Sequence, residues 1–208
     1  MTVMAAIAEK IVLTAFVAVL SCAAALAQSP LDRLYNAFSS SCVELVLSYE
    51  GRFGKTLLKG EATLLVQGDS YFMSGNGLDI FCDGESVWTV DHDALEAVVE
   101  TAENVTGAAL GNPALLIVHL DELFYVRNAS SSGNRYRYEL SAKEDCGIKK
   151  ADVDVTSAGI LLGGEFSMSD GTDVKVEVIS MKSLMNKPSG AFRPDFAFGA
   201  DWTVTDLR

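Results

Sequence analysis

The segment from Leu78 to Glu100 constrains the fold of this chain more than any other, because it has the pattern of a hairpin flanked by apolar runs. Asp83-Gly84 separates these runs, and Asp-Gly is a strong hairpin signal because a tight primed turn needs positive φ, which glycine tolerates. Val87 to Val90 mixes β-branched and aromatic residues, as strands do. A turn at Asp91-His92-Asp93 and a strand at Ala97-Val98-Val99 follow, so we expect an antiparallel meander with an apolar interior.

The same unit, a strand followed by a turn containing Gly or Asp, recurs along the rest of the chain. Alternation of apolar and polar residues is clearest from Cys42 to Glu50. Asn128 to Asn134 is rich in Ser and Gly, and we expect a polar loop there. Regular short spacing of this kind indicates a mainly β domain, closed or sandwiched. The other predicted strands are residues 55–67, 70–73, 135–142, 148–156, 160–168 and 174–179.

Two segments favour helices. Pro30 to Ser40 begins with a residue suited to the first helical position, and Leu31, Leu34 and Phe38 recur at helical spacing. We expect this helix to cover one end of the sheet. Asn112-Pro113 is a second helix start, and the residues after it are apolar almost all round, which is typical of a buried helix or one that fills a hollow.

Residues 1–27 have the layout of a secretory signal peptide. Lys10 precedes an apolar run from Ile11 to Leu20, and Ala25-Leu26-Ala27 supplies the small residues before a cleavage site. The apolar run is too short for a transmembrane helix, which needs about 20 residues. We therefore expect a periplasmic protein whose single domain spans residues 28–208. The alternative is a lipid anchor on Cys22, because Val19-Leu20-Ser21-Cys22 loosely resembles a lipoprotein-processing box.

Charge and cysteine content narrow the range of functions. The formal net charge of −12 argues against nucleic acid as a partner and against adhesion to anionic lipid surfaces. Export permits disulfides, and Cys42, Cys82 and Cys146 follow the predicted cleavage site. An odd count allows at most one internal bridge, with the pairing left open, and otherwise buried free thiols.

Motifs for catalysis, metals or cofactors are not evident. His92 and His119 have no partner at metal-binding spacing, and we expect neither to be catalytic. There is no phosphate-binding glycine loop and no Gly-x-Ser-x-Gly elbow. We therefore predict no cofactor and no enzymatic activity. What remains is an excess of aromatic and aliphatic residues spread over many strands, which favours an apolar pocket.

Three motifs in order resemble those of a known family. They are the Asp83-Gly84 hairpin with Trp88, the helix start at Asn112-Pro113-Ala114-Leu115-Leu116, and Phe196-Ala197-Phe198 followed by Trp202 to Asp206. In this order and spacing the chain resembles the periplasmic lipoprotein carriers of the LolA type. The resemblance covers nearly all of residues 28–208. It departs at Leu65 to Asp69, where the family commonly has an Arg that holds the lid closed, so we assign no residue to such a latch.

The resemblance implies an incomplete, strongly curved antiparallel β-barrel of roughly eleven strands with short α-helices covering its open face. It also implies an apolar cavity for the acyl chains of lipoproteins, which are shuttled from the inner to the outer membrane. The partners would be acylated lipoproteins and an inner-membrane ABC-type lipoprotein-releasing transporter, with the carrier acting as a monomer.

We predict apolar side chains as the ligand-binding site. The lid side would comprise Leu31, Leu34, Phe38, Leu115 and Leu116, and the strand side Leu45, Leu47, Leu64, Val66, Ile80 and Trp88. The Asp83-Gly84 hairpin places Ile80 and Val87 on one face of the sheet and Phe81 and Trp88 on the other, and which face is concave stays open. An envelope lipid-binding sensor and a membrane-anchored lipoprotein acceptor on the same fold are the alternative functions.

Overall fold

The computed structural model describes residues 28–53, 56–102, 119–195 and 198–208. Twelve strands form one sheet in the order β12-β6-β5-β4-β3-β2-β1-β11-β10-β9-β8-β7. Neighbouring strands are antiparallel, except that β12 runs parallel to β6. The strands are β1 (Cys42–Phe53), β2 (Thr56–Gln67), β3 (Ser70–Gly75), β4 (Leu78–Cys82), β5 (Ser86–Asp91), β6 (Glu96–Thr101), β7 (Phe124–Ser132), β8 (Arg135–Ala142), β9 (Ile148–Thr156), β10 (Leu161–Met168), β11 (Asp173–Leu184) and β12 (Thr203–Asp206).

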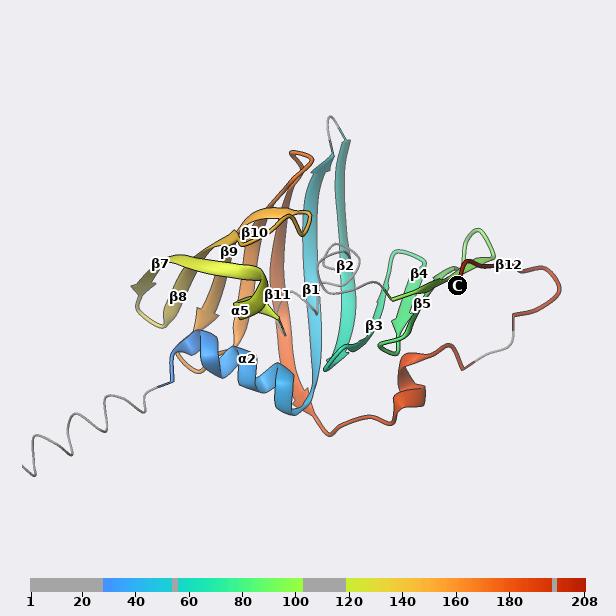
Figure 1. Cartoon of the computed structure of the whole chain (residues 1–208), viewed down its shortest axis with the longest axis horizontal. Coiled ribbons are helices and arrows are strands. Elements are labelled where there is room, and N and C mark those ends of the chain that lie inside the picture. The colour runs from blue at the N-terminus through green and yellow to red at the C-terminus, as the bar shows by residue number, and fades with distance from the viewer. Residues whose placement is uncertain (1–27, 54–55, 103–118, 196–197) are drawn as a thin grey trace, which may run out of the picture.

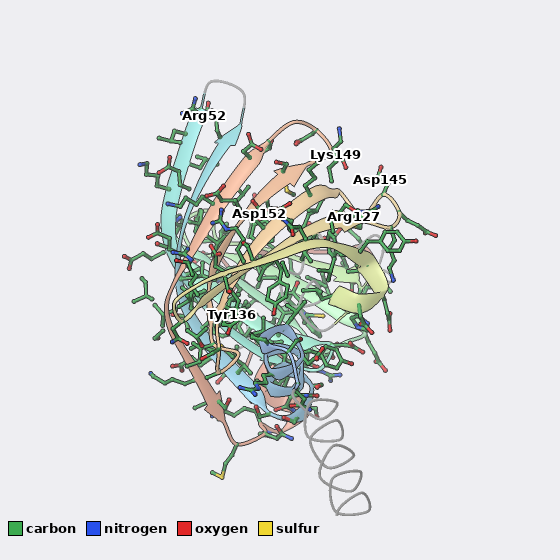
Figure 2. The ribbon with its side chains drawn as sticks, turned by 90° about the vertical axis from the view of Figure 1, so that its left-hand side faces the viewer. Arg52, Arg127, Tyr136, Asp145, Lys149 and Asp152 are labelled. Atoms are coloured by element: carbon green, nitrogen blue, oxygen red, sulfur yellow. The ribbon has the colours of Figure 1, made fainter. Side chains whose placement is uncertain are left out.

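The sheet is curled but not closed, as Figure 1 shows. The long strands β1, β2 and β11 form its middle, β10 to β7 make one wing, and β3 to β6 make the other. The prediction of an incomplete, strongly curved barrel is therefore confirmed. At one end β1 and β2 extend beyond both wings, and we call this the tip end of the sheet (Figures 1 and 2). Figure 2 labels Arg52 near that tip.

Short helices lie at the other end and over the open side. Helix α2 (Pro30–Ser40) begins with a capping box, in which the Ser29 hydroxyl accepts from the backbone N–H of Asp32 and the Asp32 carboxylate accepts from that of Ser29. The helix predicted for these residues is confirmed with the same bounds. It crosses the sheet at the end opposite the tip (Figure 1). The other helices of the described residues are α5 (Leu120–Leu123) and the 3₁₀ turn η1 (Ser189–Phe192).

The expectation of a polar loop from Asn128 to Asn134 is wrong. Most of this stretch belongs to β7, which pairs with β8 from Phe124 opposite Ala142 to Ser132 opposite Arg135. The connecting turn is confined to Gly133 and Asn134, and Gly133 has φ of 60°. Because β7 is the last strand of the sheet and its side chains after Phe124 are exposed, Ser and Asn are tolerated there.

The inner face of the sheet, which faces α2 and α5, carries the main core. Val43 and Leu45 of β1 and Leu64 and Val66 of β2 are buried in one cluster with side chains from β8 and β9. Leu34 and Phe38 of α2 complete it. Since this cluster draws on strands from the middle and both wings, burial of one apolar face explains why the sheet curls.

A smaller cluster lies on the outer face of the β3–β6 wing. Phe81, Val90 and Ala97 are buried there, and Trp88, Phe198 and Trp202 pack against them. The segment after η1 covers this cluster before β12 pairs with β6. This wing is therefore apolar on both faces.

A buried carboxylate stabilises the outer face of the other wing. Asp154 of β9 accepts from Arg135 Nη2 at 2.7 Å and from Arg137 Nε and Nη2 at 3.0 and 2.8 Å. Burial alone would raise the pKa of Asp154, but hydrogen bonds from Arg137 and Arg135 outweigh it and hold the pKa at about 2. Both arginines come from β8, so the three side chains tie β8 to β9.

We predict that Asp154→Asn lowers the free energy of unfolding by about 2 kcal/mol at pH 7. The folded-state pKa lies below the unfolded value of about 3.9, so this stabilisation is present above pH 4 and is lost as the pH falls toward 2. Urea denaturation at several pH values measures it. The difference in unfolding free energy between wild type and Asp154→Asn should disappear as the pH approaches 2. The control Asp152→Asn, on the same strand, should change the unfolding free energy little. A gap that persists at pH 2 would contradict the assignment.

Candidate functional site

The predicted site residues fall into distinct places. The structure brings together Leu34, Phe38, Leu45, Leu64 and Val66, which are buried in the main core. Leu31 and Ile80 are partly buried against the same cluster. Leu115 and Leu116 lie outside the described residues. Leu47 is half-buried on the inner face, one step from Leu45 along β1.

Trp88 lies apart from this group, on the outer face. The Asp83-Gly84 hairpin pairs Ile80 with Thr89 and Phe81 with Trp88. Ile80 and Val87 contact the main core, and Trp88 packs in the outer cluster. The alternation expected from the sequence is thus observed, and the concave face is the one that carries Ile80.

The inner face differs between its two ends. At the end under α2 the β1 and β2 side chains are almost completely buried, with Val43 and Val66 at 0% exposure. Toward the tip end, apolar side chains continue on the same face but remain partly exposed. We call these residues the upper panel: Leu47, Tyr49, Leu58, Val174 and Val176.

The pairing register of β1 with β2 and β11 brings the five residues of the upper panel together. Tyr49 lies opposite Gly60 on β2 and opposite Val176 on β11, and Gly51 lies opposite Leu58 and Val174. Gly60 leaves room for the Tyr49 ring, because a Cβ there would lie 2.6 Å from the Tyr49 hydroxyl. Leu58 remains 49% exposed. None of the five residues belongs to the core cluster of the described part of the chain.

Among the described residues the panel is only partly covered, because the β3–β6 wing reaches it at one place, where Asn76 in the β3–β4 turn donates to the Tyr49 hydroxyl. β3 pairs with β2 only from Thr63 to Gln67, so β2 continues past the wing toward the tip. Sequence reasoning missed Tyr49, Leu58, Val174 and Val176 as site residues. The alternation in each strand could have indicated their face, but their meeting depends on the pairing of β1 with β11, which are far apart in the chain.

Charged side chains occupy the reverse side of the same strands. Lys59 Nζ lies 2.7 Å from Glu50, and Lys175 Nζ lies 2.8 Å from Glu177. Two hollows of about 360 and 400 Å³ are lined mainly by these outer-face side chains, with Glu50 and Lys175 in both. On the described parts of β1, β2 and β11 around the panel the charged side chains therefore lie on the outer face, and an uncharged ligand is favoured on the upper panel.

The histidines take part in polar contacts near turns. His119 lies 3.2 Å from Asp69 in the β2–β3 turn and 3.1 Å from Glu122 of α5. His92 lies 2.9 Å from Asp79 and contacts the edge of Trp202. Among the described residues, no three His, Cys, Asp or Glu side chains are grouped so that they could hold a metal ion.

The three cysteines of the described residues are free and buried. Of the arrangements left open by the sequence, the structure has buried thiols without a bridge. Burial raises the pKa of the Cys42 and Cys82 thiols, which disfavours the reactive thiolate.

The C-terminal segment is fastened to the central hairpin. Arg193 Nε donates to the buried carboxylate of Asp83 at 2.6 Å, and its guanidinium lies 5.9 Å from the Trp88 ring centre. Phe198 and Trp202 then contact each other over the outer cluster. This explains why Trp88 is absent from the concave face: its partners come from the C-terminal segment.

No family model matches the chain, and no curated protein matches it. Similarity is found among solved structures. The chain is similar to an uncharacterized conserved protein from Thermus thermophilus, with 11% identity and a TM-score of 0.54 over 85% of this chain and 96% of that chain.

Two further solved structures are similar. A LolA superfamily protein from Nitrosomonas europaea has 13% identity and a TM-score of 0.47 over 81% of this chain and 98% of that one. A putative outer membrane lipoprotein-sorting protein domain from Vibrio parahaemolyticus has 10% identity and a TM-score of 0.41 over 78% and 94%. The resemblance predicted from the sequence is confirmed for the fold. At these identities a likeness shows fold alone.

In the part of the chain that the structure describes, no helix has the length and apolarity needed to cross a membrane.

We predict that Phe38→Ala lowers the free energy of unfolding by about 3 to 5 kcal/mol, because it empties a fully buried site between α2 and the sheet. Tyr35→Ala, on the exposed side of the same helix, should cost less than about 1 kcal/mol. Chemical denaturation measures both. Equal costs would show that α2 is not part of the core.

Proposed function

We propose that this protein carries the acyl chains of lipoproteins on the inner face of its curled sheet, as a periplasmic chaperone that shuttles them from the inner to the outer membrane. The observation that carries the proposal is the upper panel, an uncharged apolar surface left partly exposed on a face that is otherwise buried. The predicted signal peptide at residues 1–27 and the LolA-like fold support a periplasmic location for this carrier.

The free energy of transfer explains why such a surface is useful. Each buried methylene contributes about 0.8 kcal/mol, so one long acyl chain resists leaving a membrane by on the order of 10 kcal/mol. Unaided transfer through water is therefore very slow. A carrier must offer comparable apolar surroundings and still release its cargo, so a surface that is only partly covered when empty suits the task.

In this proposal one end of the inner face stabilises the fold and the other end binds the ligand. Leu34 and Phe38 of α2, with Leu45, Leu64 and Val66, hold the closed end together. The upper panel is continuous with that core through Phe166 and Val178, which are partly buried against it. In our proposal acyl chains lie along the panel, and Leu115 and Leu116, predicted from the sequence for the lid side, take part in binding them. Acylated lipoproteins and the inner-membrane releasing transporter are the proposed partners.

We predict that Leu58→Asp weakens acyl binding at least tenfold, because it places a carboxylate against hydrocarbon. The protein would be purified from the periplasm of cells that export the full chain. A triacylated cysteine amide would compete with a fluorescent long-chain acyl probe, and its affinity would be measured for each variant.

Ile179→Asp is the matched control, since Ile179 is 59% exposed at the β-bulge of β11 and outside the panel. It should bind like wild type. If Leu58→Asp binds as wild type does while remaining folded by circular dichroism, the panel is not the acyl site. If wild type does not bind the amide, the proposed function is wrong.

A further inference from the structure

Several stretches of strand edge in the described part of the sheet have no neighbouring strand. They include the outer strands β7 and β12, and the part of β11 after Glu177 on its β10 side. Another is the part of β2 nearest the tip, because β3 pairs with β2 only from Thr63 onward. We call Thr56–Gly60 the β2 edge, since β1 pairs with it on one side and no strand of the described residues pairs with it on the other. Such an edge presents unpaired backbone donors and acceptors to another chain.

β7 and β12 carry the usual protection against pairing. β7 has a bulge at Arg127, whose Nε donates to Ser141 of β8 at 2.6 Å. Asn128 also donates across to Glu139 at 3.1 Å. β12 is only four residues long. Bulges, polar side chains and short length all disfavour the addition of a further strand.

The β2 edge has no bulge and continues into the rest of a twelve-residue strand. Its register with β1 is regular from Thr56 to Val66. Leu57 is 44% and Leu58 49% exposed, and they point to opposite faces, as an added strand would need for contacts on both sides. The only cation of the segment, Lys59, is paired with Glu50 on the outer face. The edge is therefore regular and carries two exposed leucines, and among the described residues Asn76 lies beside its Gly60 end.

We propose that the β2 edge binds an extended peptide by strand addition, and that the peptide is the segment that follows the acylated cysteine of the cargo. This inference rests on the proposed function. Leu58 belongs both to the upper panel and to the β2 edge, so acyl chains on the panel would place the attached polypeptide beside this edge. Main-chain hydrogen bonds recognise a backbone and not a sequence, which suits a carrier of many different lipoproteins.

The experiment compares three ligands on the full exported protein. They are a triacylated cysteine amide, the same triacylated cysteine followed by six residues, and that lipopeptide with alternate peptide nitrogens methylated. We expect the lipopeptide to bind about tenfold more tightly than the amide, and methylation to remove this gain by eliminating hydrogen-bond donors. Amide hydrogen exchange at Thr56–Gly60 should slow on binding of the lipopeptide alone.

A pair of variants tests the location. Leu57→Glu should weaken binding of the lipopeptide severalfold without affecting the amide, because Leu57 lies on the outer face of the edge and away from the panel. Val204→Glu makes the same change on β12, where Val204 is 48% exposed, and should affect neither ligand.

Three results would overturn the inference. Equal affinity for lipopeptide and amide would show that the β2 edge does not bind the peptide, while the proposed binding of acyl chains would be unaffected. Failure of both ligands to bind wild type would remove the proposed function itself. Slow exchange at Thr56–Gly60 in the ligand-free protein, with a dimer in sedimentation, would show that a second copy occupies the edge.

Discussion

The fold depends on burying one apolar face of a sheet that does not close. The inner face carries aliphatic and aromatic side chains from the middle strands and from both wings, and they meet in one cluster. A single sheet cannot remove that face from water unless it curls and receives a cover. Helix α2 supplies the cover at one end through Leu34 and Phe38, and α5 adds Leu120 and Leu123. The curvature of the sheet and the two helices therefore both serve to remove the apolar inner face from water.

The cover is unequal along the strands, and in our proposal this difference separates the part of the face that stabilises the fold from the part that binds a ligand. Under α2 the inner face is sealed, which gives the domain its core. Toward the tip end the pairing of β3 with β2 stops, and Leu58 and Val176 keep some exposure. Filling the panel with the chain's own side chains would stabilise the fold and remove the surface available to a ligand. A partly exposed panel is the arrangement expected where binding has been favoured over stability.

Local signals in the sequence predicted most elements. The α2 helix has a Pro at its start and a capping box, and the Asp83-Gly84 hairpin has the expected positive φ at Gly84, of 92°. β7 was missed because its polar residues reflect its position at the edge of the sheet, which composition cannot convey. The face that would become concave was also undetermined, since it depends on which long-range partners cover each side. The upper panel required the pairing of β1 with β11.

The position of Trp88 shows that the apolar residues of this fold are divided between the inner and outer faces of the sheet. The sequence places many aromatic residues on its strands and shows no catalytic or metal-binding motif. If all of these aromatic side chains faced inward, they would favour an apolar cavity. In the structure Trp88 and Phe81 face outward and are covered by Phe198 and Trp202 of the chain's own C-terminal segment. Arg193 fixes that segment by its ion pair with the buried Asp83. The apolar surface that stays partly exposed on the inner face is therefore smaller than composition implies, and the upper panel lies where neither α2 nor the described C-terminal segment reaches.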